Sequence, residues 1–273
     1  MFIATNCYGW TQIAAREGRA YDRPRAMADA RAAGLTGWED AFGETSDPAG
    51  VAAEAKAAGL AMRSAYVFGT FHTAEAAALS HDHALKVCDA LMPHGVTRFI
   101  SNPNPLPGGA LKSDAELRVQ AGELERLGAS LRARGAELLF HTHSPEMRAS
   151  AREFHHMLVA TDPLSVRLCL DLHWIWRGAE NSQVALEDII RLYGDRVSEL
   201  HIRQSQNGIW HETVGEGDID MAKMAEMLKA KGAKPLLVIE HAYEEATTMT
   251  LNPVAAHAAS TDYVKRVFGA IAA

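Results

Sequence analysis

Residues 114–143, DAELRVQAGELERLGASLRARGAELLFHTH, are predicted to form a helix followed directly by a strand. The first part is rich in alanine, leucine and charged residues at helical spacing, and Gly135 suits the left-handed conformation that ends many helices. The apolar run after it is typical of a buried strand. Because this run ends in two histidines instead of turn residues, the same stretch also indicates a functional site.

The same two-part unit recurs along the whole chain. Strand-like segments occur eight times, as FIATNC (2–7), GLTGWED (34–40), LAMRSAYVF (60–68), VTRFISNP (96–103), AELLFHTH (136–143), VRLCLDLHW (166–174), VSELHIRQ (197–204) and KPLLVIEHAY (234–243). Helix-like segments lie between them, including PRAMADARAAG (24–34), GVAAEAKAAG (50–59), QVALEDIIRLYG (183–194) and MAKMAEMLKAKG (221–232). Alternating strands and helices predict a parallel sheet, and eight such units close most naturally into a barrel.

We therefore predict an α/β protein with one domain, residues 1–273, folded as a single (β/α)8 TIM barrel. The main rival is an open doubly wound sheet. That fold would usually show a glycine-rich phosphate loop, and the sequence contains neither GxGxxG nor GxxxxGK followed by Ser or Thr.

Composition and charge narrow the classes of partner. The formal net charge is -7 and the sequence pI is about 6.0, whereas nucleic-acid binding needs clustered Lys and Arg. The three cysteines are widely scattered, which fits reduced thiols better than disulfides. The opening residues MFIATNCYGW do not resemble a signal peptide, and no stretch has the roughly 18 apolar residues of a spanning helix. We expect a cytoplasmic protein that binds neither nucleic acid nor membrane.

Polar side chains stand at the ends of the last four predicted strands. They are His141, His143 and Glu146, then Asp171 and His173, then His201 and Arg203, and finally Glu240 and His241. The C-terminal ends of the strands form the active site of a TIM barrel, and a divalent cation would compensate the carboxylates gathered there. We expect the ligands to be Glu146, Asp171, His201 and Glu240. Three carboxylates and one imidazole suit Mn²⁺, which we favour, or Mg²⁺ or Co²⁺, and are compatible with Zn²⁺.

Further residues near these ends are candidates for catalysis and substrate binding. His143 or Glu240 could be the base, since imidazole titrates near working pH and a ligand carboxylate lies close to the substrate. His173, two residues after Asp171, is expected on the same side of its strand as acid, base or partner of a ligand. Arg203 could hold a substrate oxygen, and Trp174, Trp210 and His141 could contact a sugar, although barrel tryptophans also pack under helices.

The loop QSQNGIWHETVGEGDID (204–220) has two interpretations. It could be a mobile lid over the substrate. We favour the second interpretation, in which Asp218 is the N-cap of the helix that follows.

Taken together, these motifs resemble the xylose isomerase-like TIM barrel superfamily, the sugar phosphate isomerase/epimerase group. LLFHTHSPE is similar to the family's YHNHxxE strand, LCLDLHW to its LDxxH strand, LHIRQ to its HxK/R strand and GEGDID to its GxGxxD loop, while VIEH stands where the family has a metal-binding glutamate. The resemblance covers nearly the whole chain and implies the same four ligands, Glu146, Asp171, His201 and Glu240.

The fifth strand differs from that of the keto-sugar 3-epimerases of this family. Their first metal glutamate comes directly at the strand end, where this chain has Phe140 and His141. His141 or His143 is therefore an alternative first ligand. The histidine-rich strand is more similar to the inosose dehydratase and keto-glycoside-cleaving branches.

The resemblance implies a divalent-metal-dependent isomerase or epimerase of a keto-sugar, acting through a metal-stabilised enediolate. A metal-dependent lyase, meaning an eliminase, dehydratase or hydratase acting on a 3-keto-glycoside, keto-sugar or inosose, is the alternative. An abasic-site endonuclease and a non-catalytic sugar-binding subunit are less favoured. We expect a small sugar as the substrate, and a homo-oligomer is compatible with the resemblance.

Overall fold

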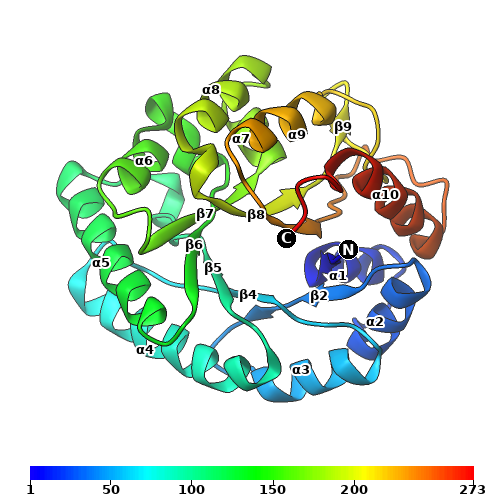
Figure 1. Cartoon of the computed structure of the whole chain (residues 1–273), viewed down its shortest axis with the longest axis horizontal. Coiled ribbons are helices and arrows are strands. Elements are labelled where there is room, and N and C mark those ends of the chain that lie inside the picture. Colours follow the sequence, from blue (N-terminus) through cyan, green and yellow to red (C-terminus); the bar gives the residue numbers. More distant parts are fainter.

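The computed structural model describes residues 1–273, and its parallel strands form a barrel surrounded by helices (Figure 1). The main sheet has nine strands in the order β2-β1-β11-β8-β7-β6-β5-β4-β3. Its ends, β2 (Gly37–Glu39) and β3 (Ala41–Phe42), are two halves of one barrel strand separated by Asp40. The nine strands therefore occupy eight positions, and the predicted TIM barrel is confirmed. The other strands are β1 (Ile3–Asn6), β4 (Ser64–Val67), β5 (Arg98–Ser101), β6 (Glu137–Phe140), β7 (Val166–Asp171), β8 (Val197–Ile202) and β11 (Leu236–Ile239).

Ten α-helices follow or flank these strands. They are α1 (Cys7–Arg16), α2 (Arg23–Ala32), α3 (Pro48–Ala57), α4 (Ala74–Leu91), α5 (Asp114–Arg132), α6 (Arg148–Val159), α7 (Leu172–Gly178), α8 (Gln183–Tyr193), α9 (Met221–Ala230) and α10 (Pro253–Phe268). Residues 114–143 form the predicted helix and strand, α5 and β6. Ser113 and Glu116 form a capping box at the start of α5, and Gly135, just beyond its end, has a left-handed φ of 80°. No helix is long and apolar enough to cross a lipid bilayer.

The main hydrophobic core lies between the barrel and its helices and contains 64 buried residues. Two smaller clusters lie apart from it, one with Phe2, Ala4, Leu236 and Val238 and the other with Ile100, Leu139 and Cys169. Val238 pairs in register with His201, and Ala4 pairs with Val238. Cys169 lies two residues before Asp171 on the same strand, so members of both clusters share the inward face of the site residues and lie inside the barrel. The barrel interior is thus apolar in part, and buried polar side chains share the remaining space.

One contact between the two layers is very close. Gly128 of α5 faces the backbone of Ser165, just before β7, and a Cβ atom added to the glycine would lie 2.0 Å from the Ser165 carbonyl oxygen. Only a residue without a side chain allows the helix to approach the strand this closely.

Candidate functional site

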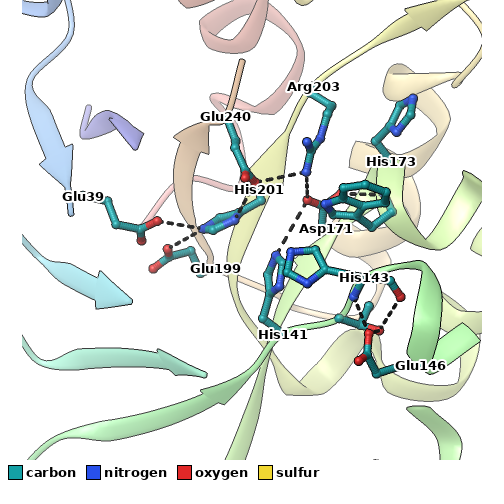
Figure 2. Close-up of polar contacts among 12 residues, drawn as sticks. Glu39, His141, His143, Glu146, Asp171, His173, Glu199, His201, Arg203 and Glu240 are labelled. Atoms are coloured by element: carbon teal, nitrogen blue, oxygen red, sulfur yellow. Dashed lines mark hydrogen bonds and ion pairs between the residues drawn. The ribbon is translucent and has the colours of Figure 1, made fainter. Parts of the chain in front are cut away.

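Four side chains converge at the C-terminal end of the barrel (Figure 2). His141, Asp171, His201 and Glu240 each offer one ligand atom, and these atoms all lie within 4.8 Å of one another. Nδ1 of His201 is 2.9 Å from Oε2 of Glu240, and Nε2 of His141 is 3.7 Å from Oδ2 of Asp171. The parallel register explains the convergence, since Asp171 and His201 are paired residues of β7 and β8. We call these four residues the ligand group.

The ligand group has the character of a metal site. None of these residues is more than 7% exposed, and both ring nitrogens of His141 are buried without a hydrogen-bond partner. Because buried polar atoms nearly always have partners, the two free nitrogens indicate a ligand for at least one of them. Two imidazoles and two carboxylates are suitable donors for Mn²⁺, Co²⁺ or Zn²⁺. These residues therefore fit a divalent ion.

Arg203 compensates the two carboxylates of the ligand group. Its Nη2 donates to Oδ2 of Asp171 at 2.5 Å and lies 3.2 Å from Oε2 of Glu240. Burial would raise the pKa of both carboxyls, but Arg203 holds the pKa of Asp171 well below its usual value and, with His201, lowers the pKa of Glu240 to about 2. Nε and Nη1 of Arg203 are buried without a partner, so two of its donors are not used within the protein.

The structure places Glu146 outside the ligand group, unlike the prediction that it supplies the first ligand. β6 ends at Phe140, and Ser144–Met147 form a short 3-10 turn with a proline in its first turn. Glu146 turns back within it, so that its Oε2 accepts a hydrogen bond from the backbone N–H of His143 at 2.7 Å. His141, the alternative first ligand, takes the place instead because it follows the strand directly.

His143 and Trp174 lie beside the ligand group. The His143 ring is 4.8 Å from the ring of His141 and meets the ring of Trp174 edge-on at 5.3 Å between centroids. Burial and the neighbouring His141 lower the pKa of His143 to about 3, so its imidazole is neutral at physiological pH. Both residues are only half-buried, and both are accessible to a substrate at the barrel mouth.

His173 lies in the first turn of α7, beyond the end of its strand. Strand alternation from Asp171 should have put it on the same side, but β7 ends at Asp171 and α7 starts at Leu172, so the spacing of a strand no longer applies. Instead, Nδ1 of His173 accepts a hydrogen bond from Nε1 of Trp210 at 3.3 Å, and its ring packs against Trp176. The strand spacing behind the prediction therefore does not apply to His173, whose role stays a prediction, while Trp174 lies beside His143.

Trp210 is held by several groups in the loop between β8 and α9. The guanidinium of Arg177 lies 4.7 Å from the centre of its ring and that of Arg203 lies 5.3 Å from it, and only 8% of the residue is exposed. Its backbone N–H donates to Glu244. Trp210 therefore packs against Arg203 and exposes little surface to a sugar.

The N-cap prediction for this loop is also wrong. Asp220, not Asp218, caps α9 by accepting from the backbone N–H of Lys223. The carboxylate of Asp218 accepts from Ser205 Oγ and from the backbone N–H groups of Asn207 and Gly208. It thereby fixes the hairpin formed by β9 (Ser205–Gln206) and β10 (Ile209–Trp210). The pattern D-I-D contains two possible capping residues, and the sequence did not distinguish them.

Two buried acids near His201 were not predicted to have a role. Glu39 ends β2 and Glu199 lies within β8, and both are at most 1% exposed. Burial and then Glu39 raise the pKa of Glu199 to about 8, whereas His201, against the effect of burial, lowers the pKa of Glu39. The strand spacing of Glu199, His201 and Arg203 could have revealed one of them, because alternate residues share a face.

Two substitutions distinguish the first ligands that the sequence left open. We expect His141→Ala to weaken Mn²⁺ binding at least about tenfold, because one of four donor atoms is lost. Glu146→Gln keeps the acceptor for His143 N–H and should change the affinity by less than about twofold. Mn²⁺ titration by isothermal calorimetry measures both, and the reverse order would restore Glu146 as the ligand.

Comparisons with known proteins agree with this architecture. A family model described as Xylose isomerase-like TIM barrel matches residues 27–267. No curated protein matches the sequence. Among solved structures, a sugar phosphate isomerase/epimerase from Parabacteroides distasonis superposes with a TM-score of 0.75 at 18% identity, covering 96% of this chain and 93% of its own.

Two further solved structures show how widely the fold is used. A D-psicose 3-epimerase from Clostridium cellulolyticum, solved with D-tagatose, has a TM-score of 0.72 at 13% identity and covers 98% of this chain and 99% of its own. An AP endonuclease, family 2, from Brucella melitensis has a TM-score of 0.71 at 16% identity and covers 96% of this chain and 98% of its own. At these identities the similarity establishes the fold alone.

Proposed function

This chain belongs to the xylose isomerase-like TIM barrel family, and from that premise and the geometry of its site we propose that it is a divalent-metal-dependent isomerase or epimerase of a keto-sugar. The observation that carries the proposal is the ligand group, whose four donor atoms come from four successive barrel strands and lie within 4.8 Å of one another. The D-psicose 3-epimerase among its structural neighbours supports the substrate class.

His141, Asp171, His201 and Glu240 would hold the ion, with Mn²⁺ the favoured species. When bound, such an ion polarises a substrate carbonyl and stabilises the negative charge that develops on its oxygen. Arg203 would bind a substrate oxygen through Nε and Nη1, which are buried without partners. Trp174 would contact the apolar C–H face of the sugar.

His143 would move the proton. Its imidazole lies beside His141 at the barrel mouth, where it would accept a proton from the carbon next to the carbonyl. Glu240 is the second candidate base, but its carboxylate already contacts His201 and Arg203. Return of the proton to the opposite face gives an epimer, and its return to the neighbouring carbon gives an aldose–ketose isomer.

The test is proton exchange on a panel of free ketoses, 3-keto-glucosides and inososes in D₂O with Mn²⁺, followed by removal of the ion and ¹H NMR. We expect deuterium at the carbon beside the carbonyl together with an epimer or isomer. Full retention of hydrogen in every compound, by protein that has bound Mn²⁺, would reject the proposal.

A metal-dependent lyase is the second candidate, favoured by one observation. The ligand group contains His141 directly after β6, and Glu146 is bonded to the backbone of His143, so this strand presents no carboxylate to face Glu240. A lyase would begin with the same proton abstraction and then lose a β-oxygen. In the same experiment, release of water or of an aglycone would identify the lyase.

An abasic-site endonuclease and a non-catalytic sugar-binding protein have less support. The net charge of -7 disfavours DNA binding, and the candidate metal groups include no histidine from β1 to β5, as additional zinc ions would require. A non-catalytic sugar-binding protein would not need a buried group of metal ligands beside unpartnered arginine donors, which this chain has.

His143→Ala tests the proposed base. We expect kcat to fall by about 10² to 10⁴, the usual contribution of a general base, with Mn²⁺ affinity unchanged because His143 is not in the ligand group. His94→Ala, at an exposed position remote from the site, is the matched control. Steady-state kinetics on the substrate found by NMR give the answer, and a nearly normal kcat would remove His143 from the mechanism.

A further inference from the structure

Two carboxylates lie on the side of His201 that faces away from Glu240 (Figure 2). Oε1 of Glu39 is 3.1 Å from Nε2 of His201, and Oε1 of Glu199 is 3.4 Å from the same nitrogen. Glu39 is 1% exposed and Glu199 is fully buried. Neither takes part in the chemistry proposed above, and both are buried from solvent.

Such a pair is costly in the interior of a barrel. Removing carboxylates from water is unfavourable unless each gains strong partners, and apolar side chains would fill the same space without that penalty. The two acids therefore call for a role beyond packing. Their contact with His201 indicates that this role concerns the imidazole.

The two nitrogens of His201 face different partners. Nδ1 points to Glu240 and the ligand group, whereas Nε2 points to Glu39 and Glu199. A histidine that binds a metal uses an unprotonated nitrogen, and the hydrogen bond of its other nitrogen decides which tautomer is present. For Nδ1 to be the donor atom, Nε2 must carry the proton and needs an acceptor.

We propose that Glu39 is a positioning residue that accepts the Nε2–H of His201 and so presents the Nδ1 lone pair to the divalent ion. Glu39 has the shorter distance to Nε2, and Ser64 fixes its carboxylate, since Oγ of Ser64 donates to Oε2 at 2.7 Å. Oε1 of Glu39 and Nε2 of His201 are both buried without a hydrogen-bond partner and lie 3.1 Å apart, so each is free to bind the other. Glu199 lacks an anchor like Ser64, because neither of its oxygens has a hydrogen-bond partner. The inference rests on the proposed metal site but not on the identity of the substrate.

The experiment compares matched substitutions on the whole chain. Glu39→Met removes the acceptor while roughly keeping side-chain volume, and Glu199→Met makes the same change at the second acid. We expect Glu39→Met to raise the Mn²⁺ dissociation constant at least about tenfold, the usual effect of losing the partner of a metal-binding histidine. Glu39→Gln, which keeps one oxygen, should fall between Glu39→Met and the wild type, and Glu199→Met should remain within about twofold of the wild type.

A second readout separates positioning from a general loss of structure. In ¹⁵N-histidine NMR of the Mg²⁺-loaded protein, the His201 ring should show a protonated Nε2 in the wild type, and this signature should be lost in Glu39→Met. If Glu39→Met does not fold, Ser64→Ala, which removes only the anchor, should still weaken Mn²⁺ binding.

The proposal is overturned if Glu39→Met binds Mn²⁺ as the wild type does, or if only Glu199→Met weakens binding. Binding of two ions per chain, reduced to one in Glu39→Met, would also overturn it, because the two acids would then be ligands themselves. A wild-type protein that binds no divalent ion would instead reject the proposed function, so the two failures are distinguishable.

Discussion

Asp171→Asn is expected to abolish high-affinity Mn²⁺ binding and turnover together. Asp171 is fully buried, and its Oδ2 lies between Nη2 of Arg203 and Nε2 of His141. Loss of an outer partner of a metal ligand already costs about 10- to 100-fold, so loss of a charged ligand should cost at least about 100-fold in affinity. The asparagine keeps an oxygen at Oδ1, which accepts the backbone N–H of Trp174 and caps α7, so the fold should survive.

Asp220→Asn is the control for this substitution. It changes the same functional group at another N-cap, but Asp220 is exposed at the start of α9 and belongs to no candidate metal group. Calorimetric titration with Mn²⁺ and kinetics on the identified substrate should leave this variant unchanged. An Asp171→Asn protein that binds Mn²⁺ normally would show that the ion is held elsewhere.

Gly128→Ala is expected to cause the largest loss of stability among conservative changes in α5. The new Cβ would lie 2.0 Å from the carbonyl oxygen of Ser165, and a backbone atom cannot move aside as a flexible side chain can. Overpacking typically costs about 1 to 3 kcal/mol, and for this contact we expect about 3 kcal/mol or more. Denaturant-induced unfolding followed by circular dichroism measures the difference in the free energy of unfolding.

The same helix supplies the matched control. Gly122 is exposed, and a Cβ there would meet nothing within 4 Å. Gly122→Ala should therefore stabilise the protein by up to about 1 kcal/mol, because alanine has the higher helix propensity. If both substitutions had the same effect, the contact between α5 and Ser165 would not be the cause.

The fold could be predicted from the sequence because each barrel strand is short, apolar and followed by a helix with clear end signals. The period of two in a strand and the parallel register also place Asp171 and His201 at one end of the barrel, as the structure has them. These are local rules that hold for as long as the strand continues. They account for the part of the site that lies on strands.

The strand rules fail where a strand has already ended. Glu146 and His173 both lie beyond the last strand residue, one in a 3-10 turn and the other in the first turn of α7, where side chains no longer alternate. Glu39 was visible in the sequence, but its contact with His201 depends on β2 lying next to β1 and, through β11, near β8. β2 and β8 come near each other only because the barrel closes. Closure depends on all the strands together, so no single segment of the sequence predicts it.

The place of Arg203 has a consequence for how the protein would be loaded with metal. Its guanidinium bridges Asp171 and Glu240, so these two buried carboxylates have a cation beside them before any ion is bound. The protein would therefore be able to fold before it binds a metal ion, whereas small domains whose only cross-link is a bound ion fold only with the ion. Metal uptake would then be an exchange of cations, in which the arriving ion competes with the Arg203 guanidinium for Asp171 and Glu240. The preference for one metal over another would depend on how easily each ion displaces the guanidinium.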